Sequence, residues 1–343
     1  MTSPLRKLSV ALAALALTAC PTQPATEDPP DAWTAALEDT FVPTDLVTHD
    51  VRIIVEPSDN AAMLIAAIDG ATQSVHMTMY LLTSPDVIDA LVRAHGRGLD
   101  VRVVLNRDFP TGGTTNDDAF NMLAAAGIGV HWAPSRYALT HEKCVVIDGR
   151  EAWIMTMNTT VSSPTTNREY LAVDREPVDV ADANAIFEAD YAGTDFPTYA
   201  GPLLLAPVNA EARLYGLISH ATTSIDVECE VVSDRNIVNA LVGAAGRGVT
   251  IRVLVDGGST NPTQTTALTS LMASGVAVRE LSTPDIHAKA IVVDGTLAYV
   301  GSINLTQPSI DLNRELGLIT DDPDAVHTIA TTIDQDFARG RAP

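Results

Sequence analysis

Short apolar runs alternate with segments of helical periodicity from about residue 50 onward, which is typical of strands alternating with helices. The first part of the chain predicts strands at Val51–Glu56, Val75–Leu82, Val101–Leu105 and near Val130, and helices at Asn60–Asp69, Pro85–His95 and Asp117–Ala126. The later part predicts strands at Leu203–Leu205, Ile225–Val232, Ile251–Val255 and Val276–Arg279, and helices at Glu211–His220, Ile237–Ala245 and Gln264–Ala273. This alternation indicates an α/β fold with mixed β-sheets flanked by helices.

The two series of elements are copies of one another. Pro57 corresponds to Pro207 and Gly96 to Gly246 at an offset of 150 residues, which shortens to 146 further along the chain. A repeat of this length indicates a duplicated half of a domain and not a solenoid unit. We therefore expect two halves, residues 46–200 and 201–343, packed about a pseudo-twofold axis.

The first 45 residues are not expected to belong to this fold. A basic start followed by the apolar stretch Leu8–Leu17 is typical of a signal peptide, and the small residues before Cys20 resemble a bacterial lipobox. We expect a lipoprotein signal peptide at residues 1–19, a lipidated Cys20, and a tether rich in proline, threonine and acids over residues 20–45. The protein would then be exported and anchored to a bacterial membrane, with the outer membrane or the periplasmic face favoured. A plain signal peptide with an unmodified cysteine is the alternative.

Charge and composition restrict the function. The net charge of −22 argues against a surface that binds a polyanion over its whole extent, although a small anion pocket is compatible with it. Only three of the 21 basic residues are lysines, and Lys7 would leave with the signal peptide, so Lys143 and Lys289 are the two that remain. An ammonium differs chemically from a guanidinium, which indicates a specific role for both lysines. Cys144 and Cys229 lie in apolar runs and are expected to be buried free thiols.

The residues that can carry chemistry also occur twice. His141 and Lys143 in the first copy match His287 and Lys289 in the second, and residues two apart on a strand project from the same face. Each pair is followed, at matched spacing, by an aspartate, an asparagine and a glutamate: Asp148, Asn158 and Glu169, then Asp294, Asn304 and Glu315. This repetition predicts one composite site to which both halves contribute.

These residue types suit the cleavage of a phosphodiester. A hairpin with returning strands at Ala152–Met157 and Leu297–Ser302 would bring each asparagine beside its histidine and lysine. One imidazole can attack phosphorus while another protonates the leaving oxygen. Lysines and amides can stabilise charge on the remaining phosphoryl oxygens. We therefore expect no metal and no other cofactor.

The paired motifs resemble those of the phospholipase D superfamily, His-x-Lys-(x)4-Asp-(x)6-Gly-Ser-x-Asn, over residues from about 50 to 340. The second copy matches throughout, including Gly301-Ser302-Ile303-Asn304. The first copy has Met155-Thr156 in place of Gly-Ser, which puts the geometry of the first half's pocket in question.

The resemblance implies a role for each matching residue. One histidine would be the nucleophile and the other the general acid, and we favour His141 and His287 respectively. The lysines and asparagines would hold the phosphate: Lys143, Asn158, Lys289 and Asn304. The carboxylates that would orient the histidines through their second ring nitrogens are Glu169 and Glu315. The residues expected to support the motif structurally are Asp148, Asp294, Ser302 and Thr156.

Three functions stay open on the sequence alone. The first is a phospholipase D-like enzyme that hydrolyses or transfers phospholipid head groups at a membrane surface through a phosphohistidine intermediate. The second is a metal-independent nuclease of the same superfamily, which the acidic composition disfavours. The third is a non-catalytic binder of anionic lipid or phosphate, which would not need two histidines. Because one chain holds both half-sites, we expect a monomer.

Overall fold

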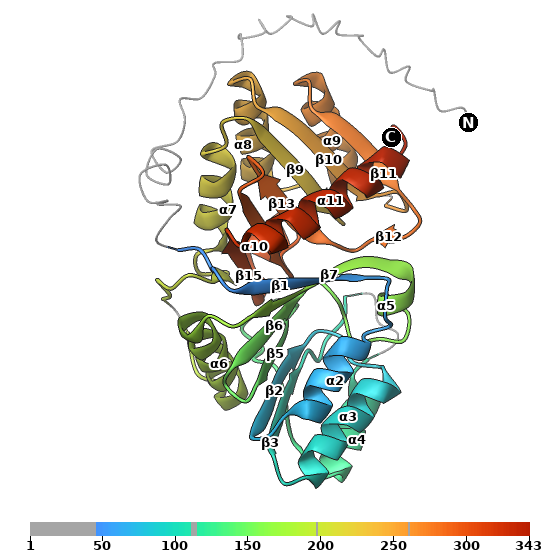
Figure 1. Ribbon diagram of the computed structural model, residues 1–343, viewed down its shortest axis with the longest axis vertical. Coiled ribbons are helices and arrows are strands. Elements are labelled where there is room, and N and C mark those ends of the chain that lie inside the picture. Colours follow the sequence, from blue (N-terminus) through green and yellow to red (C-terminus); the bar gives the residue numbers. More distant parts are fainter. Residues whose placement is uncertain (1–45, 111–114, 197, 260) are drawn as a thin grey trace, which may run out of the picture.

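The computed structural model describes residues 46–343 except 111–114, 197 and 260 (Figure 1). The predicted signal peptide, Cys20 and the tether lie outside the described residues.

The first half forms a mixed sheet in the order β1-β7-β6-β5-β2-β3-β4. Its strands are β1 Val51–Glu56, β2 Ser74–Met79, β3 Asp100–Leu105, β4 Gly129–Trp132, β5 Lys143–Ile147, β6 Glu151–Met155 and β7 Asn167–Asp174. Its helices are α2 Ala62–Gly70, α3 Pro85–Gly96, α4 Asp117–Ala125, α5 Ser163–Thr166 and α6 Pro177–Ala192. Strands β2, β3 and β4 are parallel, whereas the β2–β5–β6–β7–β1 pairings are antiparallel.

The second half repeats this topology in the order β11-β10-β9-β13-β14-β15-β8. Its strands are β8 Leu204–Ala206, β9 Ser224–Cys229, β10 Thr250–Asp256, β11 Ala277–Leu281, β12 Asp285–Ile286, β13 Lys289–Val293, β14 Leu297–Gly301 and β15 Glu315–Thr320. Its helices are α7 Ala210–Ser219, α8 Arg235–Gly246, α9 Pro262–Ala273, α10 Gln307–Asp311 and α11 Pro323–Arg339. The predicted α/β fold of two duplicated halves with mixed sheets is confirmed.

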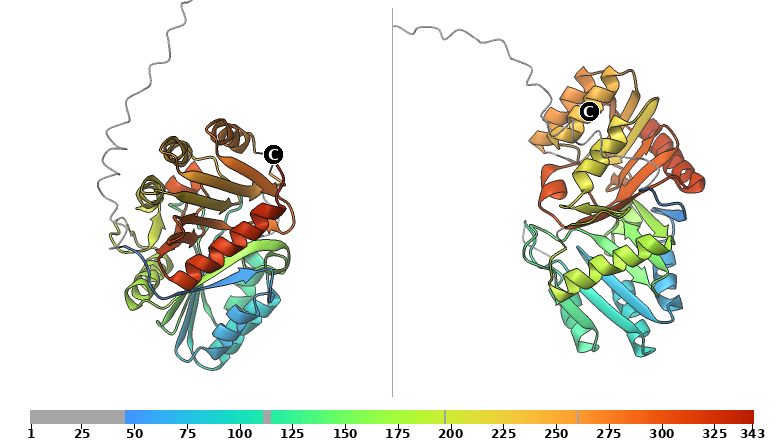
Figure 2. Two further views of the ribbon diagram at one scale, coloured as in Figure 1. Left: turned by 45° about the horizontal axis from the view of Figure 1, so that its top comes forward. Right: turned by 90° about the vertical axis from the view of Figure 1, so that its left-hand side faces the viewer.

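The halves are stacked, with helices α2–α4 at one end, α7–α9 at the other and the sheets between them (Figures 1 and 2). Each helical end has its own apolar core, and a third core unites both halves. In that shared core, Ile154 of β6 lies with Val300 of β14 and Leu316 of β15. Burial of apolar surface between the two sheets therefore holds the halves together.

Helices α6 and α11 contribute to this shared core but were not predicted from the sequence. Their buried faces include carboxylates, Asp179 and Asp190 on α6 and Asp336 on α11, among the apolar residues. The buried carboxylates have partners: Asp190 pairs with Arg314, and Asp336 pairs with Arg168. Both ion pairs join one half to the other.

The two halves also exchange short backbone pairings. Strand β12 pairs in parallel with the start of β7, where Ile286 faces Arg168. A parallel bridge between Thr140 and Arg314 is the matching pairing on the other side. The segment before each His-x-Lys motif is thus fixed to the strand that carries the other half's motif glutamate.

Asp148 and Asp294 stand in the turns of the β5–β6 and β13–β14 hairpins, with φ of 56° and 54°, and the following glycines also have positive φ. Positive φ at two successive residues is the backbone of a type I′ turn, whose twist matches that of the strands it joins. The two carboxylates accept hydrogen bonds from successive backbone N–H groups: Thr72, Gln73 and Ser74 for Asp148, and Thr222, Thr223 and Ser224 for Asp294. Both aspartates therefore hold the turns, at the strand ends remote from the histidines.

Candidate active site

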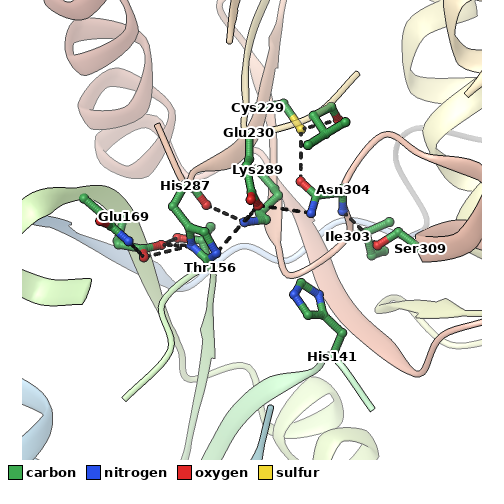
Figure 3. Close-up of polar contacts among 12 residues, drawn as sticks. His141, Thr156, Glu169, Cys229, Glu230, His287, Lys289, Ile303, Asn304 and Ser309 are labelled. Atoms are coloured by element: carbon green, nitrogen blue, oxygen red, sulfur yellow. Dashed lines mark hydrogen bonds and ion pairs between the residues drawn. The ribbon is translucent and has the colours of Figure 1, made fainter. Parts of the chain in front are cut away.

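His141 and His287 stand two residues before the first residues of β5 and β13, and each is oriented by a carboxylate of the opposite half. His141 Nδ1 lies 2.9 Å from Glu315 Oε2, and His287 Nδ1 lies 2.8 Å from Glu169 Oε1. With Nδ1 engaged in this way, Nε2 of each ring is the nitrogen left for a substrate. Figure 3 shows the His141 ring projecting toward the group formed by His287, Lys289 and Asn304.

Backbone hydrogen bonds also join each histidine to the opposite half. His141 N donates to Arg314 O at 2.9 Å, and His287 N donates to Arg168 O at 3.3 Å. Since each arginine directly precedes a motif glutamate, each histidine is fixed at backbone and side chain by the same strand of the other half.

Each orienting glutamate is itself buried and held by neutral donors. Glu169 accepts from Thr156 Oγ1 at 2.5 Å and from Asn167 Nδ2 at 3.2 Å. Glu315 accepts from Ser309 Oγ and, at 3.2 Å, from Asn313 Nδ2. Burial raises the pKa of Glu315, but His141 and Lys143 outweigh burial and hold it below its usual value. The Glu315 carboxylate is therefore charged and can fix the His141 tautomer.

The presence of Met155-Thr156 in place of Gly-Ser does not disturb the contact between Glu169 and His287. The Met155 side chain is buried in the first half's own core, while Thr156 Oγ1 reaches Glu169. The partner of Met155 across the sheet is Leu171, whereas Gly301 faces Gly317, and a Cβ on Gly301 would collide with the Gly317 backbone. Each half thus has a matched pair at this point of its sheet. Ser302, the counterpart of Thr156, bonds to the backbone of Leu316.

The two lysines are buried at equivalent places but have different partners. Lys143 Nζ donates to His141 O and lies 4.8 Å from the centre of the Tyr80 ring. Lys289 Nζ donates to His287 O at 2.6 Å and to Glu230 Oε2 at 2.8 Å. Burial, together with the positive charge of Lys289, lowers the pKa of Lys143 to about 7, against the nearby carboxylates Glu315, Glu169 and Glu230, which raise it.

The two asparagines, like the two lysines, have different hydrogen-bond partners. Asn304 Nδ2 donates to Glu230 Oε2 at 3.2 Å, and its backbone N donates to Ser309 Oγ at 3.1 Å. Asn158 is buried, and within the described part of the chain its Oδ1 has no hydrogen-bond partner. The structure therefore brings the predicted histidines, lysines and glutamates of both halves together with Asn304, whereas Asp148 and Asp294 lie apart from them.

Tyr80 and Glu230 are the site residues that sequence reasoning missed. They occupy equivalent positions, 150 residues apart, directly after β2 and β9, which end earlier than predicted. Tyr80 packs edge-on against the His141 ring with centres 4.6 Å apart, whereas Glu230 Oε2 lies 3.6 Å from His287 Nε2. The repeat offset could have identified these two positions, because it aligns the neutral Tyr80 with the acidic Glu230 just after equivalent strands. The halves are therefore not chemically alike at the site.

Cys144 and Cys229 are buried and free, as expected. In the described ranges, no group of three or more histidine, cysteine or acidic side chains is arranged to hold a metal ion. No helix among those residues is long and apolar enough to cross a membrane.

Comparison with known proteins agrees with this geometry. The family described as "Cardiolipin synthase, PLD-like domain" matches residues 64–191 and 214–339, one segment in each half. A probable cardiolipin synthase of Bacillus subtilis is 22% identical over 340 residues, covering 84% of this chain and 66% of that protein. A cardiolipin synthase of Listeria monocytogenes is 24% identical over 313 residues, covering 78% and 64% respectively. The chain thus spans about two thirds of the length of these relatives.

The fold is also that of a solved structure. The phosphatidylserine synthase of Haemophilus influenzae superposes with a TM-score of 0.69, covering 90% of each chain at 11% sequence identity. At this identity the match establishes a shared fold.

Proposed function

The chain belongs to the PLD-like domain family of cardiolipin synthases, and from this we propose that it is a phospholipase D-type phosphodiesterase acting on phospholipid head groups. It would hydrolyse or transfer the head group through a phosphohistidine intermediate, without a metal. The observation that carries the proposal is the crossed pairing of His141 with Glu315 and of His287 with Glu169. This pairing supplies two imidazoles with the same free nitrogen at one site, as in-line displacement at phosphorus requires.

The asymmetry of the site supports His141 as the nucleophile. Burial lowers the pKa of His141, as does the Lys143 charge, and these effects outweigh Glu315, which raises it. A nucleophilic imidazole must be neutral. With His141 as the nucleophile, His287 is the imidazole left to protonate the leaving oxygen, and its Nε2 lies 3.6 Å from the Glu230 carboxylate. His287 therefore suits the role of general acid.

The proposed reaction has two balanced steps. His141 Nε2 attacks phosphorus and the bond to the head-group oxygen breaks, while His287 gives its Nε2 proton to that oxygen. Neutral His287 then takes a proton from water or an alcohol, whose oxygen attacks phosphorus and releases His141. Lys143, Lys289 and the two asparagines would stabilise the phosphoryl oxygens in both steps.

Membrane attachment and oligomeric state belong to the proposal as well. Lipidation at Cys20 would keep the enzyme at a bacterial membrane, with its phospholipid substrate in reach. One chain provides both histidines, so a monomer would suffice for activity.

The test supplies the purified full-length protein, in mixed detergent micelles with chelator, with phosphatidylcholine and a primary alcohol, and separately with plasmid DNA. We expect a phosphatidyl-alcohol product from the wild type and none from His141→Ala or His287→Ala. Nicked DNA without lipid turnover would indicate the nuclease instead. Absence of turnover on both substrates, with wild type equal to His141→Ala, would indicate a binding protein.

A further inference from the structure

One carboxylate oxygen occupies the phosphate-binding groups of the second half. Glu230 Oε2 lies 2.8 Å from Lys289 Nζ, 3.2 Å from Asn304 Nδ2 and 3.6 Å from His287 Nε2 (Figure 3). An ammonium, an amide and an imidazole are the donors that a phosphoryl oxygen would also engage. Glu230 Oε2 therefore stands where one oxygen of a phosphate would bind.

Among the described residues of the first half, no carboxylate takes the corresponding place beside Lys143. At the position equivalent to Glu230 it has Tyr80, whose ring faces Lys143 and leaves that ammonium without a carboxylate partner on its own half. The charge of Lys289 is balanced by Glu230 before any ligand arrives, while that of Lys143 is not. Beyond the buried glutamates that orient the histidines, the open site thus offers less than one unbalanced positive charge near neutral pH, because the pKa of Lys143 is about 7.

The Glu230 side chain is charged, and its partial exposure leaves room for it to move. Burial raises its pKa, but Lys289 and His287 outweigh burial, so the pKa lies well below its usual value. Its side chain is 33% exposed, unlike Lys289, which is fully buried. A ligand can therefore push Glu230 aside more readily than it can move the lysine, at the cost of the Lys289 contact.

This inference rests on the proposed function. We propose that Glu230 is a specificity residue that makes the site accept phosphodiesters, with one negative charge, and reject phosphomonoesters and inorganic phosphate, with two. Coulomb repulsion scales with the product of the charges, so a dianion is disfavoured twice as strongly in free energy as a monoanion. Phosphomonoesters are largely dianionic near pH 7 because their second pKa is about 6.

The same repulsion serves the reaction. Hydrolysis converts a singly charged diester into a phosphomonoester that gains a second charge by ionisation. Glu230 would speed the release of that product from Lys289 and Asn304, and it would keep free phosphate from occupying the site.

The test compares wild type with Glu230→Gln and Glu230→Tyr, the second of which places the first half's residue in the second half. Glu151→Gln is the matched control, because Glu151 pairs with Arg175 at the remote end of the β5–β6 hairpin. Two quantities are measured at pH 7.5: the Kd of inorganic phosphate by calorimetry, and the KM of a soluble chromogenic phosphodiester.

Both Glu230 variants should bind phosphate about tenfold more tightly than wild type, and their KM for the diester should fall only about threefold, the square root of that factor. At pH 5.5, where phosphate is a monoanion, the gain in phosphate binding should also shrink to about threefold. Glu151→Gln should match wild type throughout. Unchanged phosphate affinity in both Glu230 variants, or an equal gain for phosphate at the two pH values, would overturn the inference.

Measuring phosphate binding by calorimetry tests the role of Glu230 separately from the proposed enzymatic activity. A wild type that turns over no diester, but whose phosphate affinity responds to Glu230→Gln as described, would refute the enzymatic proposal while supporting the charge selection. Turnover with an unresponsive phosphate affinity would do the reverse.

Discussion

Glu315, on β15 of the second half, holds His141 of the first, with Glu315 Oε2 2.9 Å from His141 Nδ1. The reciprocal contact joins Glu169 to His287 at 2.8 Å. Neither half can therefore build a complete histidine environment alone. The duplication supplies two similar strands, and the exchange between them makes a single site.

The crossed carboxylates predict that the two Glu→Gln variants fail at different steps. Glu169→Gln should impair His287 as general acid and slow turnover by about 100-fold with an alkyl leaving group. A p-nitrophenyl leaving group needs no proton, so formation of the intermediate from this substrate should recover most of the loss, whereas its breakdown stays slow because His287 is also the general base of the second step. Glu315→Gln should impair His141 as nucleophile and slow formation of the intermediate from both substrates alike. The rate of the first turnover, measured as release of the leaving group before steady state, tests the difference, and equal recovery in both variants would contradict the crossed assignment.

The lowered pKa of Lys143 leads us to predict that substrate affinity depends on pH. Burial places its pKa at about 7, so the ammonium is charged below this pH and neutral above it. KM for an anionic phosphodiester should therefore rise between pH 6 and pH 8. Lys143→Arg keeps its charge in this range, so its KM should stay flat, whatever its kcat. A wild-type KM that does not change across this interval would refute the role of Lys143 in holding phosphate.

The ion pairs between the halves predict an asymmetric response to mutation. Arg314 and Asp190 are both fully buried, with Arg314 Nε 2.8 Å from Asp190 Oδ2. Asp190→Ala would leave a buried guanidinium unpaired and should lower the free energy of unfolding by about 3–5 kcal/mol. The double variant Arg314→Met/Asp190→Leu removes both charges and should be much less destabilised. Urea unfolding measures both, and a double variant at least as unstable as the single one would contradict this account.

Glu142 predicts a pH-dependent stability. Burial raises its pKa to about 8, with the Asp190 charge adding to the shift. The folded state therefore keeps a proton that the unfolded chain releases above pH about 4.5, so stability declines as pH rises from there to about 8 and levels off above it. Glu142→Gln should make that decline shallower by up to about 1.4 kcal/mol per pH unit. Unfolding free energies at pH 5, 6.5 and 8 test this, and a variant with the wild-type slope would contradict it.

The sequence predicted the duplicated halves, because apolar runs and the repeat offset are visible along the chain without knowledge of which residues meet in space. It also predicted the histidines, lysines and glutamates that the structure brings together, with Asn304 beside them. It could not predict that Glu315 serves His141, since spacing along one half says nothing about which half a side chain contacts. Helix α6 was missed because the carboxylates Asp179 and Asp190 stand on its apolar face, and Asp190 is stabilised by Arg314 of the opposite half. Helix α11 has a regular apolar face through Val326, Ile329 and Ile333, so its pattern was available in the sequence and was overlooked. Glu230 escaped notice because its strand ends at Cys229, one residue earlier, and turns its carboxylate into the site.

The central claim is that His141 attacks the phosphorus atom while His287 serves as acid and base at the same site, and trapping the covalent intermediate tests it most directly. The wild type, His141→Asn and His287→Asn are mixed with a p-nitrophenyl phosphodiester, quenched in alkali and mapped by peptide mass spectrometry. His287→Asn should accumulate a phosphoryl adduct on His141, because release of the intermediate then lacks its general base. His141→Asn should carry none. An adduct on His287 in the His141→Asn protein, or undiminished turnover without any adduct in either variant, would contradict the account.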